Sequence, residues 1–98
     1  MNHLAEFEGV LPEYRARLDG LGEVASSRAE GERDNPSGHL LIRTKPIDIE
    51  ILVWESGDCE YNFGTAEEPT FEHLDLGATG DIRSLLERAI RLAGSNQS

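Results

Sequence analysis

The residues able to perform chemistry in this chain are three histidines, one cysteine and many carboxylates. His3, His39 and His73 are far apart in sequence and belong to different expected elements. Cys59 needs a positioned base to act as a nucleophile, and its place on the apolar side of an alternating segment is typical of a small buried hydrophobic residue. We therefore expect no catalytic residue among them.

Metal and phosphate sites have little support in the sequence. In the segment "EHLD" (72–75), His73 and Asp75 share one face of a strand and could form a weak metal site, but a solvated edge strand is the simpler interpretation. The segment "GATG" (77–80) precedes a helix whose N-terminus could hold an anion, yet Asp75 and Asp81 flank it and repel one. We expect no metal, no cofactor and no enzymatic activity.

The charge of the chain is concentrated in its middle third. The formal net charge is −10 over 98 residues, and no Lys or Arg occurs between Pro46 and Ile82. Ten acids lie in this interval: Asp48, Glu50, Glu55, Asp58, Glu60, Glu67, Glu68, Glu72, Asp75 and Asp81. Such a surface repels nucleic acid and anionic membranes and attracts basic partners. The alternative is that the acids serve only to keep the protein in solution.

Length and composition predict one cytoplasmic domain, residues 1–98. A single cysteine excludes an internal disulfide, and no apolar run reaches the about 18 residues that a membrane span needs. Glu6 and Glu8 interrupt the only candidate for a signal peptide, so none is expected.

Apolar residues spaced alternately three and four apart predict a helical region over residues 1–29. They are Leu4, Phe7, Leu11, Tyr14, Leu18, Leu21 and Ala25. Pro12 leaves two possibilities, a main helix that begins near it or a longer helix that kinks there. Residues 30–38 are rich in turn formers and predict a loop.

The rest of the chain predicts a sheet over residues 39–76 and a helix over residues 79–93. Four alternating segments give three or four antiparallel strands: "HLLIRT" (39–44), "IDIEILVWE" (47–55), "DCEYNF" (58–63) and the weaker "TFEHLDL" (70–76). Thr79 can cap the helix, with Asp81 in its first turn. Each strand has one apolar and one mostly polar face, so we predict an α+β fold with both helices on the apolar face.

The length of one loop decides which face holds Trp54, because a slip of one residue exchanges the faces of a strand. A three-residue loop, with Gly57 in the left-handed conformation, puts Val53 opposite Cys59 on the apolar face. Trp54 then lies opposite Asp58 on the outer face. A two-residue loop would bury acids instead, so we expect the three-residue loop.

The outer face then has the character of a protein-binding patch. The preceding hairpin, with a two-residue loop, places Arg43 opposite Asp48 on this face. An apolar centre with an aromatic anchor and a charged rim is typical of a contact site. The predicted partner-binding residues are Leu41, Asp48, Glu50, Leu52, Trp54, Glu55, Asp58 and Glu60. The alternative is that Trp54 lies at a sheet end, covered by the loop 26–38 or by the fourth strand.

The segment "VWESGDCE" (53–60), the strand pair before it and the closing helix "DIRSLLERAIRL" (81–92) resemble small immunity proteins of bacterial polymorphic-toxin systems. They are most similar to the TriTu-type immunity family. The resemblance implies a cytoplasmic antidote that binds a cognate toxin, in this case one similar to an ADP-ribosyltransferase, and blocks its active cleft or its target surface. A toxin with a basic surface suits an acidic face that carries a tryptophan anchor.

Two other functions stay open at this point. The first is an acidic adaptor or secretion chaperone that binds a basic client protein, for which a dimer is usual. The second is a small-molecule or metal-binding domain that uses His73 and Asp75. For the immunity protein we expect a monomer or a weak dimer when it is free.

Overall fold

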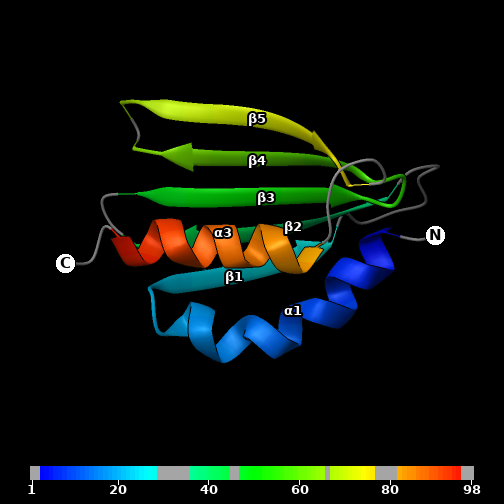
Figure 1. Ribbon diagram of the computed structural model, residues 1–98, viewed down its shortest axis with the longest axis horizontal. Helices are drawn as coiled ribbons and strands as arrows, with labels where there is room; N and C mark the ends of the chain where they lie inside the picture. Colours follow the sequence, from blue (N-terminus) through cyan, green and yellow to red (C-terminus); the bar gives the residue numbers. More distant parts are fainter. Residues whose placement is uncertain (1–2, 29–35, 45–46, 66, 77–81, 96–98) are drawn as a thin grey trace.

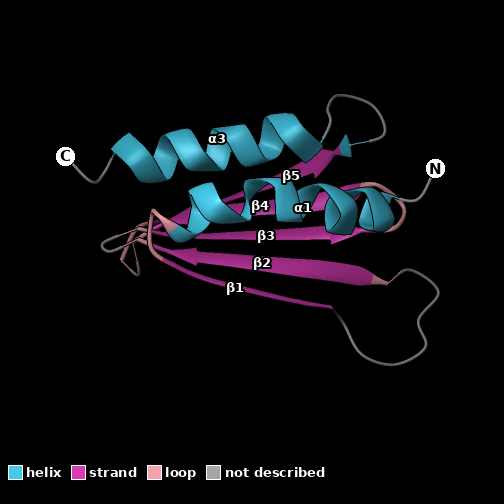
Figure 2. Cartoon of the chain, turned by 90° about the horizontal axis from the view of Figure 1, so that it is seen from below, coloured by secondary structure: helices cyan, strands magenta, loops and turns pink. Residues whose placement is uncertain are grey.

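The computed structural model describes residues 3–28, 36–44, 47–65, 67–76 and 82–95. Within these ranges, two helices and five strands follow one another as α1 (His3–Asp19), β1 (Glu23–Arg28), β2 (Ser37–Arg43), β3 (Asp48–Trp54), β4 (Asp58–Gly64), β5 (Pro69–Asp75) and α3 (Ile82–Ser95). The strands form one antiparallel sheet in the order β1-β2-β3-β4-β5 (Figure 1). Figure 2 shows both helices on the same side of the sheet. The predicted α+β fold is confirmed, with five strands in place of three or four.

The additional strand is β1, which lies inside the predicted helical region 1–29. The helix ends at Asp19, and Glu23–Arg28 pairs with β2 along its whole length. The spacing of Leu21 and Ala25 continued the helical pattern, so the prediction of a helix there was wrong. The backbone bonds that stabilise β1 come from β2, whose paired residues are ten to twenty positions away in the sequence. The side chains of β1 show little periodic pattern of their own. Strand β2 also begins at Ser37, inside the predicted loop 30–38, in place of residue 39, and residues 30–35 of that loop lie outside the described residues.

Helix α1 passes through Pro12 without ending, which selects the longer of the two predicted helices. Figure 1 shows a change of direction partway along α1, as expected where a proline removes a backbone donor. Its buried residues are Leu4, Phe7, Val10, Tyr14 and Leu18. Val10 takes the core position that the predicted stripe assigned to Leu11, which is half-buried.

Gly38 in β2 lets α1 approach the sheet closely. A Cβ atom at this position would lie 2.7 Å from Cδ1 of Leu4 and 3.4 Å from the ring of Phe7. Because carbon atoms cannot approach to 2.7 Å, a side chain at residue 38 would have to displace the buried side chain of Leu4 or the helix that carries it.

Helix α3 packs beside α1 and reaches β4 and β5 through Arg88. Its buried face consists of Ile82, Leu85, Leu86, Ala89 and Ala93. The predicted cap Thr79 and first-turn Asp81 lie outside the described residues, and the helix continues two residues past the predicted end. Arg88 covers the ring of Tyr61, with 4.4 Å from its guanidinium carbon to the ring centroid, and pairs with Glu72 at 2.8 Å.

Exposed ion pairs join the two helices. Arg17 bonds to Glu87 at 2.6 Å and Arg83 to Glu13 at 2.7 Å. Exposed pairs of this kind contribute little to stability. Among the described residues, no helix is long and apolar enough to cross a membrane.

Candidate partner-binding face

The turn after Trp54 has three residues, as predicted. Val53 is opposite Cys59 and Leu52 is opposite Glu60, so residues 55–57 form the loop. Gly57 has a φ of 103°, a backbone conformation that favours glycine, and its N–H donates to the carbonyl of Trp54 at 3.0 Å. Trp54 therefore points away from the helices.

Backbone hydrogen bonds from three other parts of the chain fix this turn. The carbonyl of Glu55 accepts a bond from the N–H of His3 at 3.2 Å, and the N–H of Glu55 donates to the carbonyl of Pro36 at 3.0 Å. The carbonyl of Gly57 accepts a bond from the N–H of Leu76 at 2.9 Å. The start of α1, the entry to β2 and the exit of β5 thus fix the position from which Trp54 and Asp58 project.

Seven of the eight predicted partner-binding residues lie on the face of the sheet that is opposite to the helices, here named the outer face. They are Leu41, Asp48, Glu50, Leu52, Trp54, Asp58 and Glu60. The eighth, Glu55, is half-buried in the turn. Asp48, Asp58 and Glu60 are exposed, whereas Trp54 and Leu52 are half-buried between neighbouring strands.

Phe71 belongs to the outer face and was missed by the sequence reading. It lies in β5 opposite Asn62, and at 71% exposure it is the only large hydrophobic side chain in the described part of the chain that is exposed. The facing of β5 was ambiguous from sequence because Phe71 and Leu74 are three residues apart, so they cannot share a face of a strand. The structure turns Leu74 toward the core and Phe71 outward.

Two polar clusters occupy the outer face. In the first, Nε2 of His39 lies 3.0 Å from one oxygen of Glu50, while the amide of Asn62 donates to the other at 3.3 Å. In the second, the hydroxyl of Ser56 donates to Asp58 at 2.9 Å, and Nε2 of His73 lies 3.6 Å from the same carboxylate. Both clusters hold acids in defined orientations at the rim of the apolar centre.

The outer face carries the negative charge of the folded chain. Its described strand positions hold six acids, Glu23, Asp48, Glu50, Asp58, Glu60 and Asp75, and one arginine, Arg43. Helices α1 and α3 together hold five acids and five arginines. Folding therefore separates a neutral helical layer from an acidic sheet face, which the linear sequence shows only as a run of acids.

The surface around Leu41 is hollowed. An open depression of about 300 Å³ runs from Leu41 and Arg43 toward Pro69, and a second of about 650 Å³ runs from the same two residues toward Glu23. Both depressions are lined by Arg43 together with acids, Asp48 and Glu50 in the first and Asp19 and Glu23 in the second.

The described residues give little support for nucleophilic or metal chemistry. Burial, with a smaller effect of the Glu60 charge, raises the pKa of Cys59 to about 12, so its thiol stays protonated and points into the core. Within the described ranges, no three His, Cys, Asp or Glu residues are placed to hold a metal ion. Comparison of this chain with protein-family models, with curated proteins and with solved structures finds no match.

Proposed function

We propose that this chain is a protein-binding domain that recognises a basic surface of a partner protein through the outer face of its sheet. The observation that carries the proposal is the joint placement of aromatic residues and acids on a face that neither described helix covers. Trp54 and Phe71 supply large, rigid apolar contacts, which dominate the binding energy of many interfaces.

Charge supports the choice of a basic partner. The excess of acids on the outer face attracts a cationic surface from a distance and accelerates encounter. The bonds of Glu50 to His39 and Asn62, and of Asp58 to Ser56, limit the side-chain freedom that binding would otherwise remove.

Within this class we propose a cytoplasmic immunity protein that neutralises a cognate bacterial toxin by occluding its active site. The resemblance of "VWESGDCE" (53–60) and of the closing helix to TriTu-type immunity proteins supports this assignment. It also supports a toxin similar to an ADP-ribosyltransferase, because a cleft that handles an anionic cosubstrate is cationic and complements the outer face.

The gene immediately upstream should encode a large secreted protein with a variable C-terminal toxin domain, and co-expression with that domain tests the proposal. Trp54→Arg should abolish protection of the host cell and leave the melting temperature close to that of the wild type, because the side chain lies outside the core. Ala16→Arg is the matched control, since it adds the same charge at an exposed position of α1.

Binding measurements on this protein and the purified toxin separate the electrostatic contribution of the acids from the apolar contribution of the aromatic residues. Glu60→Lys should weaken association mainly through a slower on-rate and a smaller dependence on salt, whereas Phe71→Ser should mainly accelerate dissociation. Full protection by Trp54→Arg together with unchanged affinity of Glu60→Lys would place the contact site elsewhere on the molecule.

A further inference from the structure

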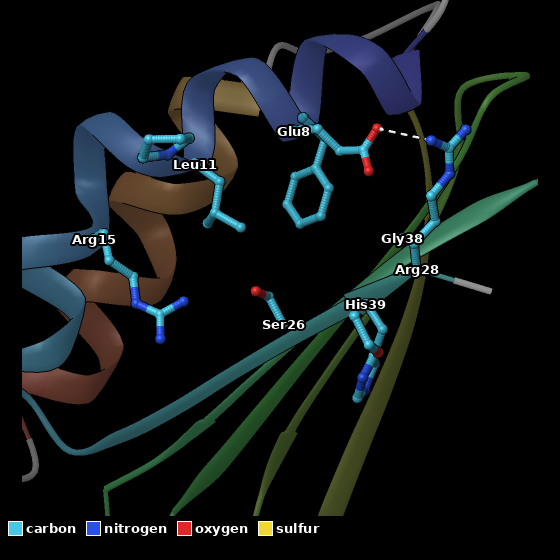
Figure 3. Close-up of a pocket in the computed structure, with 10 residues that line it drawn as sticks. Glu8, Leu11, Arg15, Ser26, Arg28, Gly38 and His39 are labelled. Atoms are coloured by element: carbon cyan, nitrogen blue, oxygen red, sulfur yellow. Dashed lines mark ion pairs between the residues drawn. The ribbon is translucent and has the colours of Figure 1, made fainter. Parts of the chain in front are cut away.

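A groove of about 480 Å³ lies between α1 and the edge strand β1, on the side of the sheet that faces the helices. Phe7, Leu11 and Pro12 of the helix form its apolar wall. Figure 3 shows the side chains of Leu11 and Arg15 pointing from α1 toward the strand, with Ser26 pointing back from β1. Its volume is within the range of sites that bind ligands or peptide side chains.

The outer backbone edge of β1 borders this groove and pairs with no other described strand. In antiparallel sheets, bonded and non-bonded pairs alternate, and Thr44 is bonded to Ile47 across the β2–β3 hairpin. The odd-numbered residues of β2 therefore face β1, where their register partners are residues 23, 25 and 27. It follows that Val24, Ser26 and Arg28 turn their N–H and C=O groups away from the sheet.

A contact of α1 agrees with this assignment. The guanidinium of Arg15 donates a bond to the carbonyl of Val24 at 3.3 Å, which requires that this carbonyl point outward from β2. Arg15 covers one end of the edge, and the backbone groups of Ser26 and Arg28 continue it along the groove.

The two edges of the sheet differ in their protection against pairing. At the β5 edge, Pro69 lacks a donor, and Glu72, His73 and Asp75 are polar or charged. Such residues block pairing at natural sheet edges. The four central residues of β1, Val24 to Ser27, are small and uncharged and include no proline.

The groove contains two arginines, in contrast to the acidic outer face. Arg15 and Arg28 line its two ends, and Glu8 is the acid among its lining residues. Arg15 also bonds to Asp19 at 3.1 Å, and the side chains of this pair are about half exposed. Oε1 of Glu8 lies 3.7 Å from Nη1 of Arg28, and both side chains are about half exposed. An incoming carboxylate can replace or share this weak surface pair.

We propose that the edge of β1 binds an extended, acidic segment of another protein as a sixth strand of the sheet. Side chains two residues apart share a face of a strand. An apolar residue opposite Ser26 therefore enters the groove against Leu11. The residues two positions before and after it lie near Arg15 and Arg28, where carboxylates are favoured. The segment has the pattern acid–any–apolar–any–acid, and its backbone pairs with Ser26 and Arg28.

This site is separate from the outer face, and its occupant has the opposite charge. The inference therefore stands or fails independently of the proposed immunity function.

A blocked peptide of sequence TETLTET tests the inference, with TKTLTKT and TETSTET as controls. Titration of the full chain should shift the backbone amide signals of residues 24–28 and of the groove side of α1. The first peptide should bind at least tenfold more tightly than either control. Equal binding of TKTLTKT, or no binding of TETLTET at millimolar concentration, overturns the proposal.

Variants of the protein complete the test. Ser26→Pro removes an N–H that faces the groove and leaves the bonds to β2 in place, so the fold should persist while peptide affinity falls at least tenfold. Arg28→Glu should lower the affinity for TETLTET by a similar factor, and the Trp54→Arg variant should bind this peptide with the affinity of the wild type. Unchanged affinity of a folded Ser26→Pro variant contradicts pairing at this edge. A dimer that Ser26→Pro converts to a monomer would show that the occupant is a second copy of the chain, which also overturns the proposal.

Discussion

The N–H of Gly57 donates a hydrogen bond to the carbonyl of Trp54 across 3.0 Å, which closes the three-residue turn between β3 and β4. The turn places Val53 and Cys59 opposite each other in the core and leaves Trp54 and Asp58 on the outer face. One backbone contact thus decides the facing of two strands, because the side-chain period of a strand is two.

Replacement of Gly57 by alanine should lower the free energy of unfolding by about 1–3 kcal/mol, because its φ of 103° strains any residue with a Cβ atom. Gly9→Ala is the matched control: Gly9 lies in α1, and a Cβ there meets no atom within 4 Å. That variant should raise stability by about 0.5–1 kcal/mol through helix propensity. Denaturant unfolding measures both, and equal effects of the two variants would contradict the role assigned to Gly57.

Tyr61→Phe should stabilise the protein or leave its stability unchanged. The ring is fully buried, and its hydroxyl finds no hydrogen-bond partner among the described residues. Removal of an unsatisfied buried hydroxyl recovers a desolvation cost of about 1–3 kcal/mol. The contact of the ring with Arg88 at 4.4 Å is retained in phenylalanine.

Tyr14→Phe provides the comparison of opposite sign. The hydroxyl of Tyr14 hydrogen-bonds to Glu87, so its loss should destabilise the protein by about 0.5–1.5 kcal/mol. Thermal unfolding of the two variants in one buffer gives the difference directly. A larger destabilisation by Tyr61→Phe than by Tyr14→Phe would show that the Tyr61 hydroxyl has a partner.

The buried thiol of Cys59 should make the protein less stable in alkali. Burial raises its pKa from an ordinary value near 9 to about 12, so the unfolded chain loses this proton at a lower pH than the folded chain does. The contribution is fully present below pH 9 and is lost as the pH rises from 9 toward 12. Unfolding by guanidinium chloride between pH 7 and pH 11 measures how steeply the free energy of unfolding falls with pH.

Cys59→Ala isolates this effect from the titration of other groups. The variant should be less stable at neutral pH, because it removes a buried sulfur, but its stability should fall less steeply above pH 9. A thiol reagent should also label native Cys59 far more slowly than the unfolded chain. Rapid labelling at neutral pH would show that the residue is accessible.

The parts of this fold that could be predicted are those that neighbouring residues in the sequence specify. The pairing of β2, β3 and β4 followed from local features: alternating residues, a two-residue and a three-residue loop, and one glycine at the second turn. Pro12 and the apolar stripe indicated α1, although the choice between its two possible starts needed the structure.

Strand β1 and the facing of β5 could not be predicted from such local features. Val24 is the one aliphatic residue of β1 that turns toward the core, so its strand form depends on backbone bonds to β2 that no local pattern encodes. Phe71 and Leu74 are three residues apart and cannot share a face of a strand, so only pairing with β4 assigns Phe71 to the outer face.

The sequence by itself determined that Trp54 lies opposite to the core, because loop length and residue alternation are properties of contiguous residues. It also showed that the acids are clustered. Only the tertiary structure decided that Trp54 is half-buried, that Phe71 joins it, and that Arg15 reaches the edge of β1. These features arise where segments distant in sequence pack together, and no local pattern specifies such contacts.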